Sequence, residues 1–173
     1  MADTDQGIKG LVDRAEDVAG GLIGRAAAAM TTGADRFVEE AAISDRYEIE
    51  AGALALGRAS APDVRAAAQM MIDDHGRNSE ALQALLARRG GPTPPMVLDA
   101  RRQSLLHHLR DAAANAFDAI YVEQQVMAHQ EALTLMRGYR DRGDDEGLRR
   151  FAAEAAPMIE RHLDHMKGLR ARI

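Results

Sequence analysis

The sequence predicts an all-α protein, in which a ferritin-like four-helix bundle follows one additional amphipathic helix. Only 3% of the 173 residues are aromatic, whereas 46% are hydrophobic, and many of these are alanines. This composition favours close helix packing over strands. No run of β-branched residues long enough for a strand occurs. A chain of this length supports one domain with a substantial core, because two domains would each be marginal.

The charge and cysteine content exclude several classes of partner and site. The formal net charge is −5, which argues against nucleic acid as a partner because phosphate contacts need a basic surface. The chain has no cysteine, so disulfides and thiolate metal sites are excluded.

The first residues and the hydropathy bear on localisation. The start MADTDQ is acidic, whereas a signal peptide needs a basic start and a longer apolar run. No segment approaches the roughly 18 apolar residues of a membrane span. We therefore expect a soluble protein, cytoplasmic as the sequence is written and periplasmic if an export signal has been removed.

Residues 8–30 predict an amphipathic helix with one continuous apolar stripe and charges on the other side. The charges are mixed rather than basic, which favours packing against the bundle or a neighbouring subunit over a membrane surface. Homo-oligomer contact and membrane-surface contact through this helix both stay open. The stripe consists of Ile8, Leu11, Val12, Ala15, Ala19, Leu22, Ile23, Ala26 and Met30.

Four longer helices are expected after this segment, because apolar residues recur at helical spacing between clear breaks. The break SAPD places Pro62 in a first turn, where proline is tolerated. The breaks GGPTPP and DRGDDEG follow, and residues 96–114 predict a short helix and a loop before Asn115, a suitable N-cap. The long helices are expected over residues 34–59, 62–89, 115–142 and 146–172.

The lengths of the connections predict how these helices are joined. Short turns separate the first from the second and the third from the fourth, so each pair should form an antiparallel hairpin. Residues 90–115 can run the length of the bundle, since helices of roughly 24–28 residues are about 36–42 Å long. This pattern is that of a ferritin-like bundle over residues 34–173, with residues 1–33 as a separate N-terminal helix.

Each long helix carries one ionisable residue on its apolar face near mid-length. Glu48 and His75 lie at similar distances from the first turn, and His129 and His162 at similar distances from the second. Equal distances from the turn of an antiparallel hairpin mean equal heights, so the four side chains should converge. Three imidazoles and one carboxylate suit a divalent zinc, iron or manganese ion.

The same residues could instead form a metal-free hydrogen-bond network in the core. Burial of all four without partners would carry a heavy desolvation cost, which favours an ion for the set. His107 and His108 lie in the link between the hairpins and are expected to be exposed to solvent.

Four segments resemble the ferritin-like bacterial family catalogued as domain of unknown function 4142. They are EIEAGALALGRAS, MMIDDH, FDAIYVEQQVMAHQEAL and APMIERHL. The resemblance covers about residues 34–170 and implies a ferritin-like bundle in an exported bacterial protein of unsettled function. The chain departs from this pattern by lacking an export signal and by carrying the helix at 8–30. The matching positions are Glu48, Asp74, His75, Phe117, Asp118, Tyr121, His129, Pro157 and His162.

The expected site differs from the di-iron centres of ferritins, which use Glu-x-x-His pairs. The residues three before the histidines are Ile72, Val126 and Ile159. We therefore expect a mononuclear site. Asp118 precedes His129 by about 16 Å of helix, so the two cannot bind the same ion. The residues expected to surround the ligands are Asp74, Asp118, Tyr121 and Gln125.

Three functions are compatible with these residues. The first is a metal-binding bundle, which the resemblance links to stress or envelope physiology. The second is a mononuclear iron or manganese oxidoreductase acting on oxygen or peroxide, with Tyr121 as a nearby redox or hydrogen-bonding group. The third is a metal-free structural or membrane-associating protein that uses residues 8–30. No phosphate-binding loop is visible, and no serine is set against a base.

Overall fold

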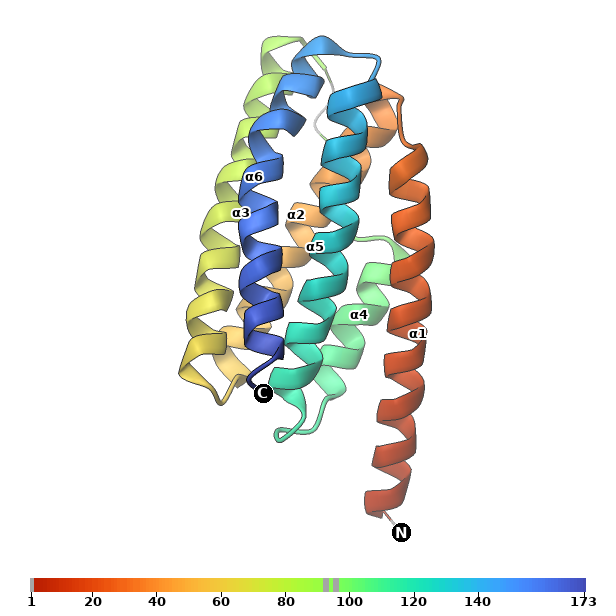
Figure 1. Ribbon diagram of the computed structural model, residues 1–173, viewed down its shortest axis with the longest axis vertical. Coiled ribbons are helices and arrows are strands. Elements are labelled where there is room, and N and C mark those ends of the chain that lie inside the picture. Colours follow the sequence, from red (N-terminus) through yellow and green to blue (C-terminus); the bar gives the residue numbers. More distant parts are fainter. Residues whose placement is uncertain (1, 92–93, 95–96) are drawn as a thin grey trace.

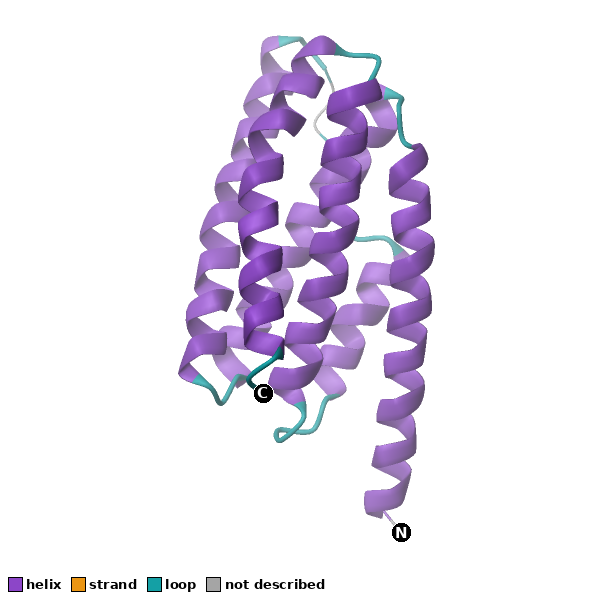
Figure 2. Ribbon diagram, viewed as in Figure 1, coloured by secondary structure: helices purple, strands orange, loops and turns teal. Residues whose placement is uncertain are grey.

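The computed structural model contains six helices and describes the backbone of residues 2–91, 94 and 97–173. No strand occurs in the described parts of the chain, which confirms the all-α fold (Figure 2). The GGPTPP break lies partly outside them. The helices are α1 (Ala2–Met30), α2 (Ala34–Arg58), α3 (Pro62–Arg88), α4 (Ala100–Asp111), α5 (Phe117–Arg142) and α6 (Glu146–Arg170).

The four long helices α2, α3, α5 and α6 form the bundle in the expected topology (Figure 1). Tight turns join α2 to α3 at one end and α5 to α6 at the other. The long link between α3 and α5 returns along the bundle and contains α4, so α3 and α5 run in the same direction (Figure 1). In this arrangement α2 packs on α5 and α3 packs on α6.

The core is narrow because small residues bring the helices of the first hairpin together. Gly52 of α2 faces α3, and a Cβ built on it would lie 2.9 Å from Ile72 Cγ1 and 3.0 Å from the Ala68 carbonyl oxygen. Any side chain there would push the helices apart. Aromatic rings pack together in the core, where Phe37 stacks on Tyr139 with ring centroids 4.0 Å apart.

The starts of α3 and α5 differ in how their backbone amides are satisfied, and at α5 the N-cap predicted from the sequence is not observed. Asp118 accepts hydrogen bonds from the backbone amides of Ser60 and Ala61 and from the Ser60 hydroxyl. It therefore satisfies the start of α3, where the first amides have no partner within the helix. Asn115 is not the N-cap of α5, because the helix begins at Phe117 and the capping position is Ala116, which makes no side-chain hydrogen bond.

Helix α1 packs along α5 and α4 at the outside of the bundle (Figure 1). Of the contacts expected for its apolar stripe, packing on the bundle is not the one that forms, and contact with a second subunit or a lipid surface stays a prediction. Asp17, Gly21 and Ala28 face the bundle and are buried, whereas Leu22 is 60% exposed and Ile23 is 71% exposed. The side chains of Ile8 and Leu11, the first two residues of the stripe, lie outside the described residues.

The contact of α1 with the bundle is largely polar, which explains this orientation. Asp17 accepts hydrogen bonds from the His108 ring at 2.7 Å and from the Gln124 amide at 2.8 Å. His108 is therefore mostly buried, contrary to the prediction that it lies in solvent, while His107 is exposed as expected. Buried carboxylates need such partners, so the polar face of α1 turns inward.

Glycines on the same face let α1 lie directly over a buried ion-pair cluster. Arg101 and Arg102 both donate to Glu131, at 2.6 Å and 2.8 Å. A Cβ on Gly24 would clash with the Glu131 carboxylate and approach the Arg101 guanidinium to 2.9 Å. The glycine at position 24 thus allows this close approach, and its backbone conformation does not itself call for glycine.

We expect Gly24→Ala to loosen α1, because the added methyl group must displace either the helix or a carboxylate held by two arginines. The expected destabilisation is about 1–3 kcal/mol, seen as faster hydrogen exchange of the α1 amides and a lower melting temperature. Gly10→Ala in the same helix is the matched control, since its Cβ would meet nothing within 4 Å. Equal exchange rates in the two variants would contradict the close approach at Gly24.

Candidate metal centre

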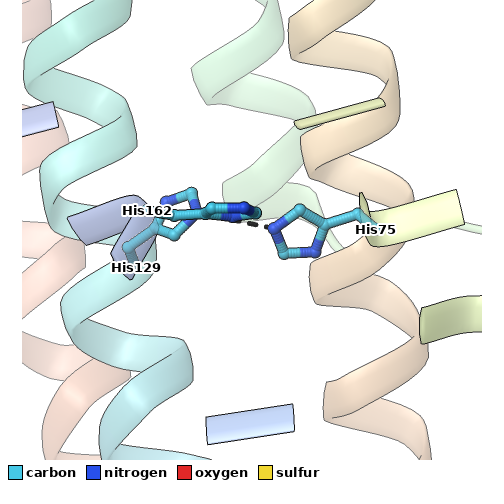
Figure 3. A group of neighbouring side chains, drawn as sticks. All are labelled: His75, His129 and His162. Carbon is cyan, nitrogen blue, oxygen red and sulfur yellow. Dashed lines mark hydrogen bonds between the residues drawn. The ribbon is translucent and has the colours of Figure 1, made fainter. Parts of the chain in front are cut away.

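Three histidines converge at mid-height in the core of the bundle (Figure 3). His75 comes from α3, His129 from α5 and His162 from α6. Each side chain is at most 2% exposed. One ring nitrogen of each lies within 4.8 Å of the corresponding nitrogens of the other two. The structure therefore brings together three of the four residues predicted as ligands.

The other ring nitrogen of each histidine is held by a hydrogen-bond acceptor. His75 Nδ1 lies 2.8 Å from Asp45 Oδ1, and His129 Nδ1 lies 2.8 Å from the Gln125 carbonyl oxygen. His162 Nε2 lies 2.8 Å from Asp74 Oδ2. In a neutral imidazole one nitrogen donates and the other accepts. These contacts therefore leave His75 Nε2, His129 Nε2 and His162 Nδ1 with lone pairs toward the centre.

The central nitrogens are left without adequate partners. His75 Nε2 and His129 Nε2 lie 3.4 Å apart, and His162 Nδ1 is buried without a hydrogen bond. Two lone pairs at this distance repel each other unless a proton or a cation lies between them. Two nitrogen ligands of a tetrahedral zinc ion, each at about 2.0–2.1 Å, would be about 3.3–3.4 Å apart. The observed separation matches that requirement.

The environment keeps two of the imidazoles neutral. Burial lowers the pKa of His129 well below its ordinary value, and the neighbouring histidines act in the same direction. Burial also lowers the pKa of His162, to about 4. Burial opposes the charged form of His75 too, but the hydrogen bond and charge of Asp45 raise its pKa overall. A metal ligand must be neutral imidazole, and His129 and His162 are in that form at neutral pH.

Glu48 is buried beside the histidines, but it does not join their central nitrogens. Its nearest imidazole nitrogen is His129 Nδ1, at 3.6 Å, and this is the nitrogen that contacts the Gln125 carbonyl. Both Glu48 carboxylate oxygens lack hydrogen-bond partners, and burial raises the pKa of this carboxyl to about 7. The structure thus places Glu48 behind His129 and not in the ligand position predicted from the sequence.

The other polar residues expected near the site are only partly gathered there. The Gln125 side-chain amide and the Tyr121 hydroxyl are buried without hydrogen bonds, and the burial that raises the pKa of Tyr121 is reinforced by the charge of Glu48. Asp74 contacts His162, as a supporting carboxylate should. Asp118 is not near the site, because it lies at the end of the bundle and caps α3.

Asp45 is the supporting residue that the sequence analysis missed. It is 2% exposed, accepts from His75, and also accepts from the Asn78 amide at 2.9 Å. Its position three residues before Glu48 puts it on the same side of α2. A second acidic residue on the apolar face was the signal that could have identified it.

Comparison with known proteins agrees with the fold. The chain matches the family described as Domain of unknown function (DUF4142) over residues 23–169. It is also similar to the crystal structure of a DUF305 fragment from Deinococcus radiodurans, with 16% sequence identity and a TM-score of 0.71. That match covers 80% of this chain and 95% of the other. Curated proteins gave no match. No helix in the described residues is long and apolar enough to cross a membrane.

The lowered pKa of His162 predicts acid destabilisation of the metal-free protein. Its value is about 4 in the folded state and about 6.5 in an unfolded chain. The unfolded state therefore binds more protons between these two pH values. The contribution of neutral His162 to the free energy of unfolding is fully present above pH 6.5 and is lost as the pH falls toward 4. Urea unfolding should show an extra loss of about 3 kcal/mol across this window, relative to His162→Gln.

Glu48 has the opposite effect. Because its pKa is raised to about 7, its contribution to the free energy of unfolding falls as the pH rises from about 4.5 to 7. Both proteins contain Glu48, so the comparison of wild type with His162→Gln isolates the effect of His162. His165→Gln is the control, because His165 lies on the same helix and is exposed. If the pH dependence of His162→Gln equals that of the wild type, His162 does not titrate as the structure requires.

Proposed function

We propose that this chain, which belongs to the family described as Domain of unknown function (DUF4142), binds one divalent metal ion through three core histidines. The ligands are His75 Nε2, His129 Nε2 and His162 Nδ1. One observation carries the proposal: each ring has its outer nitrogen held by an acceptor and its inner nitrogen directed to a common centre. Metal-bound histidines are characteristically oriented in this way.

The distribution of unsatisfied polar atoms supports an occupied centre. Buried polar atoms in proteins are almost always hydrogen-bonded. In the described residues, the buried side-chain nitrogen and oxygen atoms without a hydrogen-bond partner belong to four residues only. One of these atoms, His162 Nδ1, is a proposed metal ligand. These residues are Glu48, Tyr121, Gln125 and His162. An ion at the centre would satisfy His162 Nδ1 directly.

The chemistry of the three ligands limits the choice of ion. Three neutral imidazoles suit zinc, iron or manganese, and the absence of thiolates disfavours softer ions such as Cu(I). The separation of 3.4 Å between two of the nitrogens fits a tetrahedral zinc-like ion best. The hydrogen bonds from Asp45 and Asp74 would fix the ring orientations and raise the basicity of the ligands.

A second candidate function is an oxidoreductase with iron or manganese at the same centre. The observation that favours it is the number of ligands: three nitrogens converge, and Glu48 lies behind His129. Catalytic sites characteristically keep one coordination position open for water or substrate. Turnover of peroxide or oxidation of Fe(II) by the loaded protein, abolished in His75→Ala, would support catalysis. Tight binding of the metal without peroxide turnover or Fe(II) oxidation would indicate a metal-binding protein that is not an enzyme of this class.

We expect His75→Ala to remove most of the bound metal, because two nitrogens hold a divalent ion much less tightly than three. Elemental analysis of the untagged protein should give one ion per wild-type chain, and the melting temperature should fall in His75→Ala and be insensitive to added metal. His107→Ala is the control, because His107 is an exposed histidine outside the centre. One ion per chain in both variants would place the metal elsewhere.

Glu48→Gln distinguishes the ligand set of the structure from the one predicted from the sequence. If the three histidines hold the ion, this variant should retain about one ion per chain, with an affinity within about tenfold of the wild type. If Glu48 were a ligand, the loss should resemble that of His75→Ala. Affinity measured by isothermal titration should also fall as the pH is lowered, because protons compete for the His75 imidazole first, whose pKa is raised by Asp45.

A further inference from the structure

The outward face of α1 is apolar and is left uncovered by the fold. Four alanines line it at positions 15, 19, 26 and 29, all of them exposed. Most of the exposed large hydrophobic side chains of the described chain lie on this one helix. They are Val12 at 50%, Val18 at 41%, Leu22 at 60%, Ile23 at 71% and Met30 at 83% exposed. A continuous patch of this kind marks an interaction site.

The patch has the spacing of a helix–helix contact. Val12, Ala15, Ala19, Leu22, Ala26 and Ala29 follow one another at alternating intervals of three and four residues. We call these six residues the outward seam. Apolar residues in this heptad pattern pack against another helix. The inward face repeats the pattern at Asp17, Gly21, Gly24 and Ala28, which lie against the bundle, so α1 presents two seams on opposite sides.

The sequence of the outward seam matches itself in the antiparallel direction. If Leu22 lies opposite Ala19 of a second copy, Val12 lies opposite Ala29 and Ala15 lies opposite Ala26. Each large residue then meets a small one, which lets two helices approach closely. A two-fold axis between the helices makes the contact self-complementary, as closed dimers require.

The charges beside the seam favour a second copy over a lipid surface. Binding to anionic lipid needs free basic side chains flanking the apolar face. Here Lys9 pairs with Asp111, Arg14 pairs with Glu123, and Arg25 donates to Gln130. The basic residues near the seam are thus engaged with the bundle.

We propose that two copies of this protein associate through the outward seams of α1, with the two helices antiparallel and Leu22 of each copy against Ala19 of the other. The seam spans about 26 Å of helix. Such a contact lies at the small end of specific interfaces, below the ~800 Å² per partner that is standard. Contacts of this size are typically weak or transient, so the association is to be sought at protein concentrations of about 10–100 μM, the range of weak complexes.

Sedimentation of the full chain across this concentration range tests the association. We expect a concentration-dependent monomer–dimer equilibrium in the wild type and at least tenfold weaker association in Leu22→Glu, where a buried charge has no partner. Leu56→Glu is the matched control, because Leu56 is an exposed leucine of α2 outside the seam. Circular dichroism melting establishes that each variant is folded. A wild type that stays monomeric, or equal weakening by the two variants, overturns the proposal.

The orientation can be tested by cross-linking, since the chain contains no cysteine. Ala19→Cys and Leu22→Cys chains of different tag size are mixed and oxidised. The antiparallel pair should give the mixed 19–22 disulfide in clear excess over the two homodimers. Predominant 19–19 and 22–22 products would show parallel helices and contradict the arrangement.

Flotation with vesicles of phosphatidylcholine, with and without phosphatidylglycerol, tests the alternative occupant. We expect no flotation of the wild type beyond that of Leu22→Glu. Vesicle binding that Leu22→Glu abolishes would assign the seam to lipid and overturn the proposal. This result is independent of the metal centre, whose ligands lie on α3, α5 and α6.

Discussion

The requirement that buried imidazoles be hydrogen-bonded governs the arrangement of the core. A lone buried histidine can satisfy one nitrogen from a local carbonyl, as His129 does with Gln125 one turn earlier. His75 and His162 instead each contact a carboxylate from a neighbouring helix, Asp45 and Asp74 respectively. These contacts tie α2 to α3 and α3 to α6 at one height. Because they use the outer nitrogens, they also create the inner cluster that suits a metal ion.

The fold and the three histidines were predictable because both depend on distances along the chain. Short turns and the long link between α3 and α5 determine which helices are antiparallel, and equal distance from a turn then gives equal height. The distances along the chain do not determine how far each helix is rotated about its own axis. Successive residues are about 100° apart around the helix, so a modest error in the expected rotation changes which neighbour a side chain faces. Glu48 was therefore placed at the right height but on the wrong side of His129, and Asp45 was not identified.

Helix α1 shows a different limit of sequence reasoning. An apolar stripe predicts burial but does not say against what, and here the polar and glycine face offered a better fit to the bundle. Asp17 finds His108 and Gln124, and Gly24 allows contact with a buried arginine–carboxylate cluster. These partners lie more than 70 residues away in the sequence, so no local pattern reveals them. The apolar stripe consequently remains available for a contact outside the chain.

The two proposed sites are built on opposite physical principles, and this makes them separable. The histidine centre is fixed by directional hydrogen bonds in a medium of low polarity, where an unpaired group is costly, and it responds to pH and to metal. The outward seam depends on non-directional burial of small and branched side chains, and it responds to protein concentration. The family match begins at residue 23, within α1, so most of that helix precedes the matched region while all three histidines fall inside it. A change in the seam should therefore leave the metal centre intact, because mutations at distant sites without shared partners act additively.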